Sequence, residues 1–245
     1  MKRWLLLVVP VLLVACGEGT PTQPALRANR PAFAVVSDLS ARQWRLFSVM
    51  PATSAFWDID HLASMSDGVA AFPFQPFVAK NSGEFAVYLE SNYNYDITGK
   101  TITADVSWDP GTFATRSTKF PGAYARVEFQ DVASGNYTSN DYWWYSGSFV
   151  DLNAATTSGT LTAPLSDRAH WSNVCGQSAD DINSYPGPNC VGGTDPAISP
   201  YDGFTNAMKN VKVVSLAFGS AGSFASGVAV VDGSSTFTLS SFTIN

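Results

Sequence analysis

The sequence predicts an all-β protein: a two-sheet antiparallel β-sandwich with one or two short helical turns. Three observations lead to this prediction. Short runs of β-branched and aromatic residues recur between clusters of Gly, Asn, Asp and Pro. No stretch sustains a 3.6-residue hydrophobic period over several turns. Charged residues make up only 14% of the chain, against 45% hydrophobic and 13% aromatic residues, so uncharged polar side chains are expected to cover the sheets.

Eight segments show the strand pattern. In chain order they are 85–90, 101–108, 123–130, 142–146, 160–164, 212–218, 227–231 and 235–244. The clearest is 101–108, where apolar residues at even positions alternate with Thr, Asp and Ser at odd positions. One face of this strand is expected to pack and the other to meet water. Eight strands in one domain fit two packed sheets.

Two local features modify this pattern. In the last strand the apolar phase slips by one residue at Ser240 and Ser241, which predicts a β-bulge. The segments 204–210 and 60–66 are each long enough for one or two helical turns. Neither helix would change the fold class.

The chain begins with an expected export signal. Two basic residues precede an apolar run over 4–14, which is too short to span a bilayer and is typical of a signal peptide. The run ends in Leu-Val-Ala-Cys at 13–16, which resembles the bacterial lipobox. This resemblance implies a lipoprotein: residues 1–15 are removed, and Cys16 carries acyl chains such as palmitate. Several chains on one cysteine make a stable membrane anchor.

Residues 16–36 are rich in proline and lack periodicity, so they are expected to be a tether that leads to a single β-sandwich domain over 37–245. The lipobox resemblance places the protein in a bacterial cell envelope. Because Gly17 rather than Asp follows the lipidated cysteine, it implies an outer-membrane anchor, with the domain periplasmic or surface-exposed. The alternative is an ordinary secretory signal in which Cys16 is incidental.

The two other cysteines, Cys175 and Cys190, are expected to form a disulfide in this oxidising compartment. Closing a loop of about 15 residues contributes about 3 kcal/mol by chain entropy. The alternative is a redox or metal pair, but the spacing is not CxxC. A net charge of −6 leaves no basic stripe for nucleic acid, and two histidines cannot build a His-rich metal centre.

Several strand segments resemble a known family. The sequence Ile-Thr-Gly-Lys-Thr-Ile at 97–102, with the amphipathic strand that follows, is similar to a strand of jelly-roll carbohydrate-binding modules and galactose-binding-like sandwiches. Segments 211–219, 227–230 and 237–244 are similar to their closing strands. The resemblance implies a jelly-roll fold and glycan binding. In those modules an Asp of the last strand often helps to hold a structural calcium, but Ser240 and Ser241 stand there in this chain. No cofactor is therefore expected, and the alternative is a structural calcium ion that no motif supports.

Exposed aromatic rings are the candidate ligand-binding feature. Sugars pack their C–H faces on such rings, while neighbouring Asn and Asp side chains pair with their hydroxyl groups. Rings of this kind occur in SNYNYD, in DYWWYSG and beside His170. The candidate ligand-binding residues are Tyr93, Tyr95, Trp143, Trp144, Tyr145 and Trp171. Trp143 and Trp144 must point to opposite faces of a strand. The alternative is that all these rings fill the core.

The sequence favours a non-catalytic lipoprotein that binds a glycan or a similar polyhydroxylated ligand, with the membrane and a polysaccharide as partners. The alternative is a structural or adhesive surface lipoprotein with a protein partner and no sugar site. A polysaccharide hydrolase or lyase is less favoured, and the chain is expected not to be an enzyme, because no catalytic motif can be assembled. Glu90 and Glu128 lie on strand segments, where they could serve as acid and base, but a solvated face is expected for both.

Overall fold

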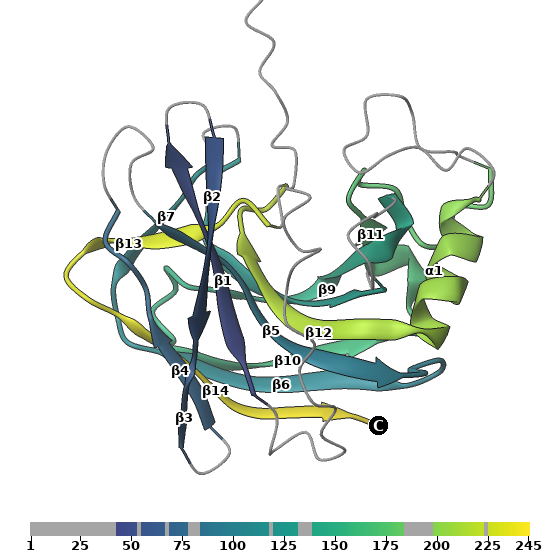
Figure 1. The fold of residues 1–245 in the computed structure, drawn as a ribbon, viewed down its shortest axis with the longest axis horizontal. Helices are drawn as coiled ribbons and strands as arrows, with labels where there is room; N and C mark the ends of the chain where they lie inside the picture. Colours follow the sequence, from purple (N-terminus) through teal and green to yellow (C-terminus); the bar gives the residue numbers. More distant parts are fainter. Residues whose placement is uncertain are drawn as a thin grey trace, which may run out of the picture.

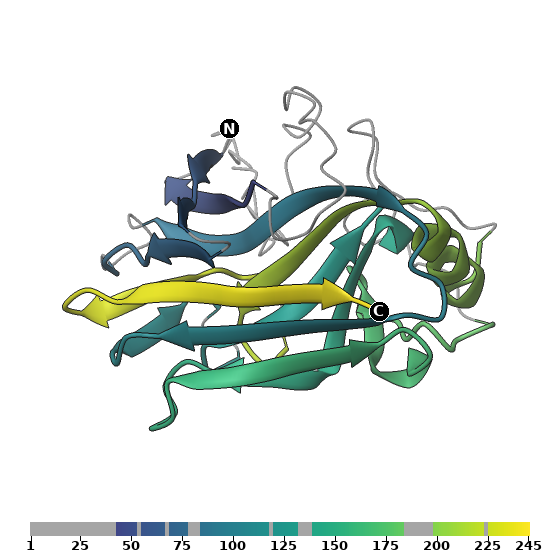
Figure 2. The same ribbon diagram turned by 90° about the horizontal axis from the view of Figure 1, so that it is seen from below.

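The computed structural model describes residues 43–52, 55–66, 69–77, 84–117, 120–131, 139–183, 198–222 and 225–245. The expected signal peptide and tether lie outside the described residues. The described chain forms two antiparallel sheets packed face to face, so the predicted all-β sandwich is confirmed (Figures 1 and 2). No helix in the described ranges is long and apolar enough to span a membrane.

The larger sheet has nine strands in the described part of the chain. Its main path runs β11-β9-β8-β12-β5-β1-β2, with β13 pairing to β5 and β7 to β13. The strands are β1 Arg45–Ala52, β2 Ala55–Leu62, β5 Phe85–Tyr95, β7 Thr112–Thr115, β8 Tyr124–Gln130, β9 Tyr142–Asp151, β11 Trp171–Asn173, β12 Val211–Gly219 and β13 Val228–Asp232. Strands far apart in sequence therefore lie side by side in this sheet.

The smaller sheet has five described strands in the order β10-β6-β14-β4-β3. They are β3 Ser64–Ser66, β4 Val69–Pro73, β6 Thr101–Trp108, β10 Ser158–Pro164 and β14 Thr236–Ile244. Along β6, buried residues alternate strictly with half-buried ones, as predicted for a strand with one packed face. The predicted bulge is also confirmed, because the register of β14 against β6 shifts between Leu239 and Ser241.

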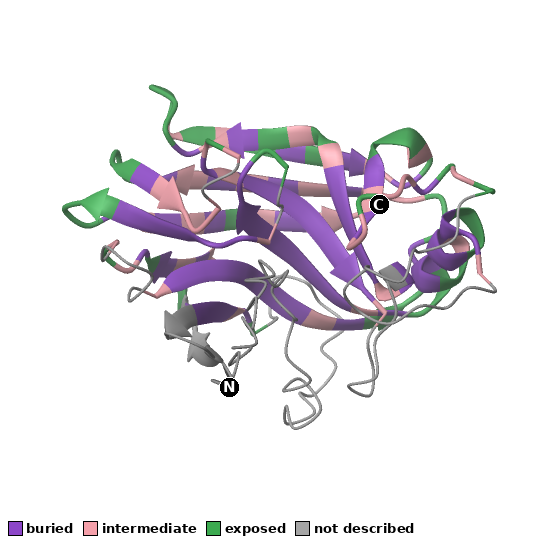
Figure 3. Ribbon diagram, turned by 90° about the horizontal axis from the view of Figure 1, so that it is seen from above, coloured by how far each residue is buried: buried purple, intermediate pink, exposed green. Residues whose placement is uncertain are grey.

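Aromatic rings fill much of the space between the sheets. Phe72 of β4, Phe218 of β12 and Phe237 of β14 are all buried, and their ring centroids lie 5.0–5.6 Å apart. Edge-to-face rings at such distances stabilise a core beyond their buried area. Buried residues run along the central strands, whereas exposed residues gather toward the rims (Figure 3).

The predicted helix near 204–210 is confirmed as α1, Pro200–Lys209. The hydroxyl of Ser199 caps its start by accepting a hydrogen bond from the backbone N–H of Asp202 at 3.2 Å. Short 3₁₀ turns precede β9 (η3, Ser139–Asp141) and β11 (η4, Arg168–His170). The helix predicted over 60–66 is wrong, because these residues pair with β1 and β4 as the end of β2 and as β3.

Candidate functional site

The six aromatic candidates do not form one exposed set. Only Tyr95 among them is exposed, at 43%, and it packs edge-on against Tyr93 at the end of β5. The other five are at most 5% exposed. The expectation that these rings lie uncovered is therefore wrong for Tyr93, Trp143, Trp144, Tyr145 and Trp171. A core with few Leu and Ile side chains needs such rings to fill its volume.

Two of the buried candidates pack beneath α1 around Phe204. The ring of Trp143 lies 4.9 Å from that of Phe204, and Trp171 lies 5.6 Å from it. Both indoles are also satisfied, since Trp143 Nε1 donates to Asn140 O at 2.6 Å and Trp171 Nε1 to Pro164 O at 3.0 Å. These contacts give both tryptophans a structural role.

Tyr145 belongs to a hydrogen-bonded group at the rim of the same region. Its hydroxyl donates to Asp167 Oδ2 at 2.6 Å, and His170 Nδ1 lies 2.9 Å from the same carboxylate. Burial, together with this carboxylate, raises the pKa of Tyr145 to about 12. The hydrogen bonds from Tyr145 and His170 lower the pKa of Asp167. The arrangement fixes the turn before β11.

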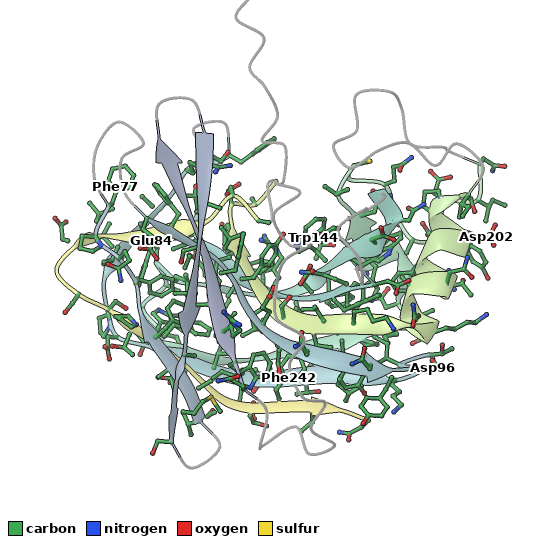
Figure 4. The ribbon with its side chains drawn as sticks, in the orientation of Figure 1. Phe77, Glu84, Asp96, Trp144, Asp202 and Phe242 are labelled. Carbon is green, nitrogen blue, oxygen red and sulfur yellow. The ribbon has the colours of Figure 1, made fainter. Side chains whose placement is uncertain are left out.

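Trp144 points the other way, as its place next to Trp143 predicts. It belongs to a second buried cluster, with Tyr142, Tyr88 and Phe47, on the face of the nine-stranded sheet turned away from the smaller sheet. We call this face the outer face. The Trp144 ring stacks on Tyr142 with centroids 6.3 Å apart and an interplanar angle of 18°. Figure 4 labels Trp144 on this sheet.

A row of polar residues continues across the outer face from Trp144. Strand register pairs each member directly with the next, from β9 through β8, β12 and β5 to β1. Directly paired residues of antiparallel strands project to the same side of a sheet. The members of this polar row are Trp144, Glu128, Ser215, Glu90 and Arg45.

The carboxylates of this row are buried, contrary to the expectation of a solvated face. Glu128 is 0% exposed and Glu90 is 4% exposed. Beyond Glu128 on β8, Gln130 also lies on the outer face and is fully buried. Burying ionisable groups is costly unless they are paired, and such groups concentrate at functional sites. The outer face thus differs from the inner face, which is packed mainly with apolar side chains and carries none of these charged groups.

The outer face has an exposed aromatic end at the start of β8. Phe149 of β9 is 52% exposed and packs edge-on against Tyr124 at 5.2 Å. The buried guanidinium of Arg126 lies over both rings, at 5.1 and 5.6 Å from their centroids, and donates to Ser220 O at 3.2 Å. Burial lowers the pKa of Arg126 to about 10, a value at which it still carries its charge near neutral pH.

Tyr124, Arg126 and Gln130 were not singled out from the sequence, although a signal for them was present. Tyr124, Arg126, Glu128 and Gln130 alternate with Ala and apolar residues along β8. This alternation shows that they share a face, but the pattern also fits an ordinary solvated face. Burial sets Arg126, Glu128 and Gln130 apart from such a face.

The remaining site expectations concern cysteines and metals. Cys175 is disulfide-bonded, and its expected partner Cys190 lies outside the described residues, as does the expected lipidation site Cys16. Among the residues that the structure describes, no group of three or more His, Cys, Asp or Glu side chains is arranged to hold a metal ion.

Comparison with known proteins finds a weak overall likeness to a solved structure. No protein-family model matches the chain, and no curated protein matches it. The chain is similar to a variant of LamA from Z. galactanivorans, solved in complex with laminaritriose and laminaritetraose, at 10% sequence identity and a TM-score of 0.40; the match covers 86% of this chain and 97% of that chain. The expectation that this chain is not an enzyme is withdrawn.

Proposed function

We propose that this protein binds a glycan on the outer face of its nine-stranded sheet. The observation that carries the proposal is the polar row, a line of Trp, Glu, Ser, Glu and Arg across five adjacent strands. Aromatic rings flank this row along the same face, with Tyr142 beside Trp144 and Tyr88 next to Glu90 along β5. Apolar rings with a few convergent polar groups are typical of small-molecule sites.

The chemistry of the outer face suits polyhydroxylated ligands. Carboxylates accept hydrogen bonds from sugar hydroxyls, while Gln130 and Arg126 can donate to them. The faces of the rings accept the C–H side of a sugar. Because the outer face carries both arginine and glutamate side chains, it favours a neutral glycan over a strongly charged one.

The ligand is proposed to enter at the exposed end, where the Phe149 ring is the most accessible aromatic side chain of the outer face. Along β8 the next outer-face residue lies about 6.7 Å further on, since alternate residues of a strand are two rises apart. A chain of sugar units that contacts Phe149 and Tyr124 would therefore lie along β8 toward Arg126. The polar row beyond Arg126 is buried in this structure, so the first contacts are those of the exposed end.

Substituting the exposed ring tests this site. Phe149→Ala should weaken retention on an insoluble polysaccharide by about tenfold, since an aromatic contact of about 1–1.5 kcal/mol is lost. Its melting temperature should change little, because the ring is half exposed. Binding is measured by affinity electrophoresis and calorimetry across a panel of polysaccharides and tetraoses, laminaritetraose included.

Tyr95→Ala is the matched control, because Tyr95 is similarly exposed but lies at the end of β5, away from the outer face. It should bind as the wild type does. Weakened binding in Tyr95→Ala with unchanged binding in Phe149→Ala would indicate that the glycan binds at the end of β5 instead. Absence of binding to every glycan of the panel would overturn the proposed function.

We also propose that the domain is presented at the bacterial envelope by acyl chains on Cys16. The proposal rests on the apolar run and the Leu-Val-Ala-Cys sequence at 13–16. A tethered domain would meet polysaccharides at the cell surface or in the periplasm.

A further inference from the structure

We propose that Tyr145, Asp167 and His170 form a binding site for a ferric ion at the rim of the sandwich. The three side chains come from two elements. Tyr145 belongs to β9, whereas Asp167 precedes η4 and His170 ends it. The site lies apart from the outer face, because Tyr145 belongs to the core cluster between the sheets. The inference therefore does not depend on glycan binding.

The donor atoms of the three side chains converge on one carboxylate. Tyr145 Oη donates to Asp167 Oδ2 at 2.6 Å, and His170 Nδ1 lies 2.9 Å from both Oδ1 and Oδ2. Donors that bind one ion at right angles, through bonds of about 2.1 Å, lie about 3 Å from each other. An ion can therefore take the place of the bridging hydrogens with small shifts of the side chains.

Hydrogen bonds around the site hold η4 in place. Ser146 Oγ donates to His170 O at 2.9 Å. The guanidinium of Arg168 donates to Ala179 O and to Tyr201 O, both at 3.1 Å. Supporting bonds of this kind fix the orientation of metal ligands. They also place carbonyl oxygens around the charge of Arg168, which lessens its repulsion of a cation.

The site is open to solvent on the side of η4. The side chain of His170 is 56% exposed, and that of Asp167 is 36% exposed. Tyr145 is buried, and its ring packs 5.1 Å from that of Trp171. An ion can thus enter from solvent, and water can fill the coordination positions that the three side chains leave.

The donor set favours ferric iron. It offers two oxygens and one imidazole nitrogen, and it contains no thiolate, the ligand that soft ions prefer. Carboxylate and ionised phenol are hard anionic donors, and a tyrosine oxygen is known as a ligand of haem iron. Together they balance two of the three charges of the ion. On binding, the phenol gives its proton to solvent, and the imidazole keeps its proton on Nε2.

A colour change tests the site, because a phenolate bound to ferric iron absorbs visible light. The protein titrated with ferric nitrilotriacetate should gain a visible charge-transfer band that saturates at one ion per chain. Tyr145→Phe should abolish the band, and His170→Ala and Asp167→Asn should each weaken binding by about tenfold or more. Equilibrium dialysis measures the bound iron independently of colour, and circular dichroism checks that each variant is folded.

Tyr95→Phe is the matched control, because Tyr95 is an exposed tyrosine at the end of β5. It should keep both the band and the affinity. A wild-type protein that gains no band, or a band that survives Tyr145→Phe, would overturn the proposal.

His170→Ala decides the question if Tyr145→Phe does not fold, because the His170 side chain is exposed. Unchanged iron binding by this variant in dialysis would overturn the site. Loss of the band on adding an equal concentration of Zn(II) would overturn the assignment to ferric iron.

Discussion

At the scale of single residues, the surroundings of a titratable side chain set its pKa, as Asp131 shows. Asp131 lies just after β8, where Asn210 Nδ2 donates to its Oδ1 at 2.7 Å. Its backbone N–H donates to Asp141 O at 2.9 Å, which holds the two acidic residues close together. Burial, and then the charge of Asp141, raise the pKa of Asp131 to about 6 from an ordinary 3.8.

This shift predicts a stability contribution that depends on pH. An acid with a raised pKa binds its proton more tightly in the folded state, so folding gains stability as pH falls through about 6 and loses it as pH rises. Asp131→Asn should therefore raise the melting temperature by about 2 °C at pH 7.5, since a half-buried group contributes about 1 kcal/mol or less. The difference should shrink at pH 5. Thermal unfolding at both pH values checks this, and an equal difference at both would contradict it.

At the scale of elements, α1 shows how a helix in an all-β chain is fixed by its contacts. Its start is capped by Ser199, and its buried side packs Phe204, Ala207 and Met208 onto the sandwich. Gly203 lies on that side against Asn140 of η3. A Cβ atom placed on Gly203 would lie 2.5 Å from Asn140 Cγ.

Gly203→Ala should therefore destabilise the fold although alanine favours helices. The gain in helix propensity is about 1 kcal/mol, whereas forcing a methyl group into a tight contact costs about 1–3 kcal/mol. Asn140 has little freedom to move, because its Oδ1 accepts a hydrogen bond from Asn173 Nδ2 at 2.9 Å. We expect the melting temperature to fall by about 2–4 °C.

Asn206→Ala provides the control for Gly203→Ala, because Asn206 is exposed on the same helix. It should be neutral or slightly stabilising. If thermal unfolding shows that the Gly203→Ala protein is at least as stable as the wild type, the prediction is wrong. Asn140 would then be able to move away from the added methyl group.

At the scale of the whole molecule, the space between the two sheets and the outer face of the nine-stranded sheet have different compositions. The space between the sheets is mainly apolar and aromatic, and its packing holds the sandwich together. The outer face of the nine-stranded sheet instead carries the buried glutamates and Arg126 beside aromatic rings. A site built on strands of a rigid sheet keeps its side chains in register.

Anchoring is also a property of the whole chain. Cys16→Ser should shift the protein from the membrane pellet to the soluble fraction, because the acyl chains that would supply the membrane affinity are lost. The fold should not change, as far-ultraviolet circular dichroism would show. A variant that stays in the membrane pellet would contradict lipidation at Cys16.

Local patterns were enough to predict several parts of the fold. The alternation over 101–108 predicts the half-buried strand β6, and the phase slip at Ser240 and Ser241 predicts the bulge in β14. The opposite directions of Trp143 and Trp144 follow from strand geometry alone. The segment 60–66 fails as a helix because pairing with β1 and β4 overrides its weak local preference.

By itself, the sequence determined the all-β class, the approximate strands and the faces within each strand, because these depend on neighbours along the chain. The tertiary structure alone decided that Glu128 and Glu90 flank Ser215 and are buried. That alignment depends on the order and register of β8, β12 and β5, which meet only through long-range pairing. Alternation along one strand carries no information about which strand lies beside it.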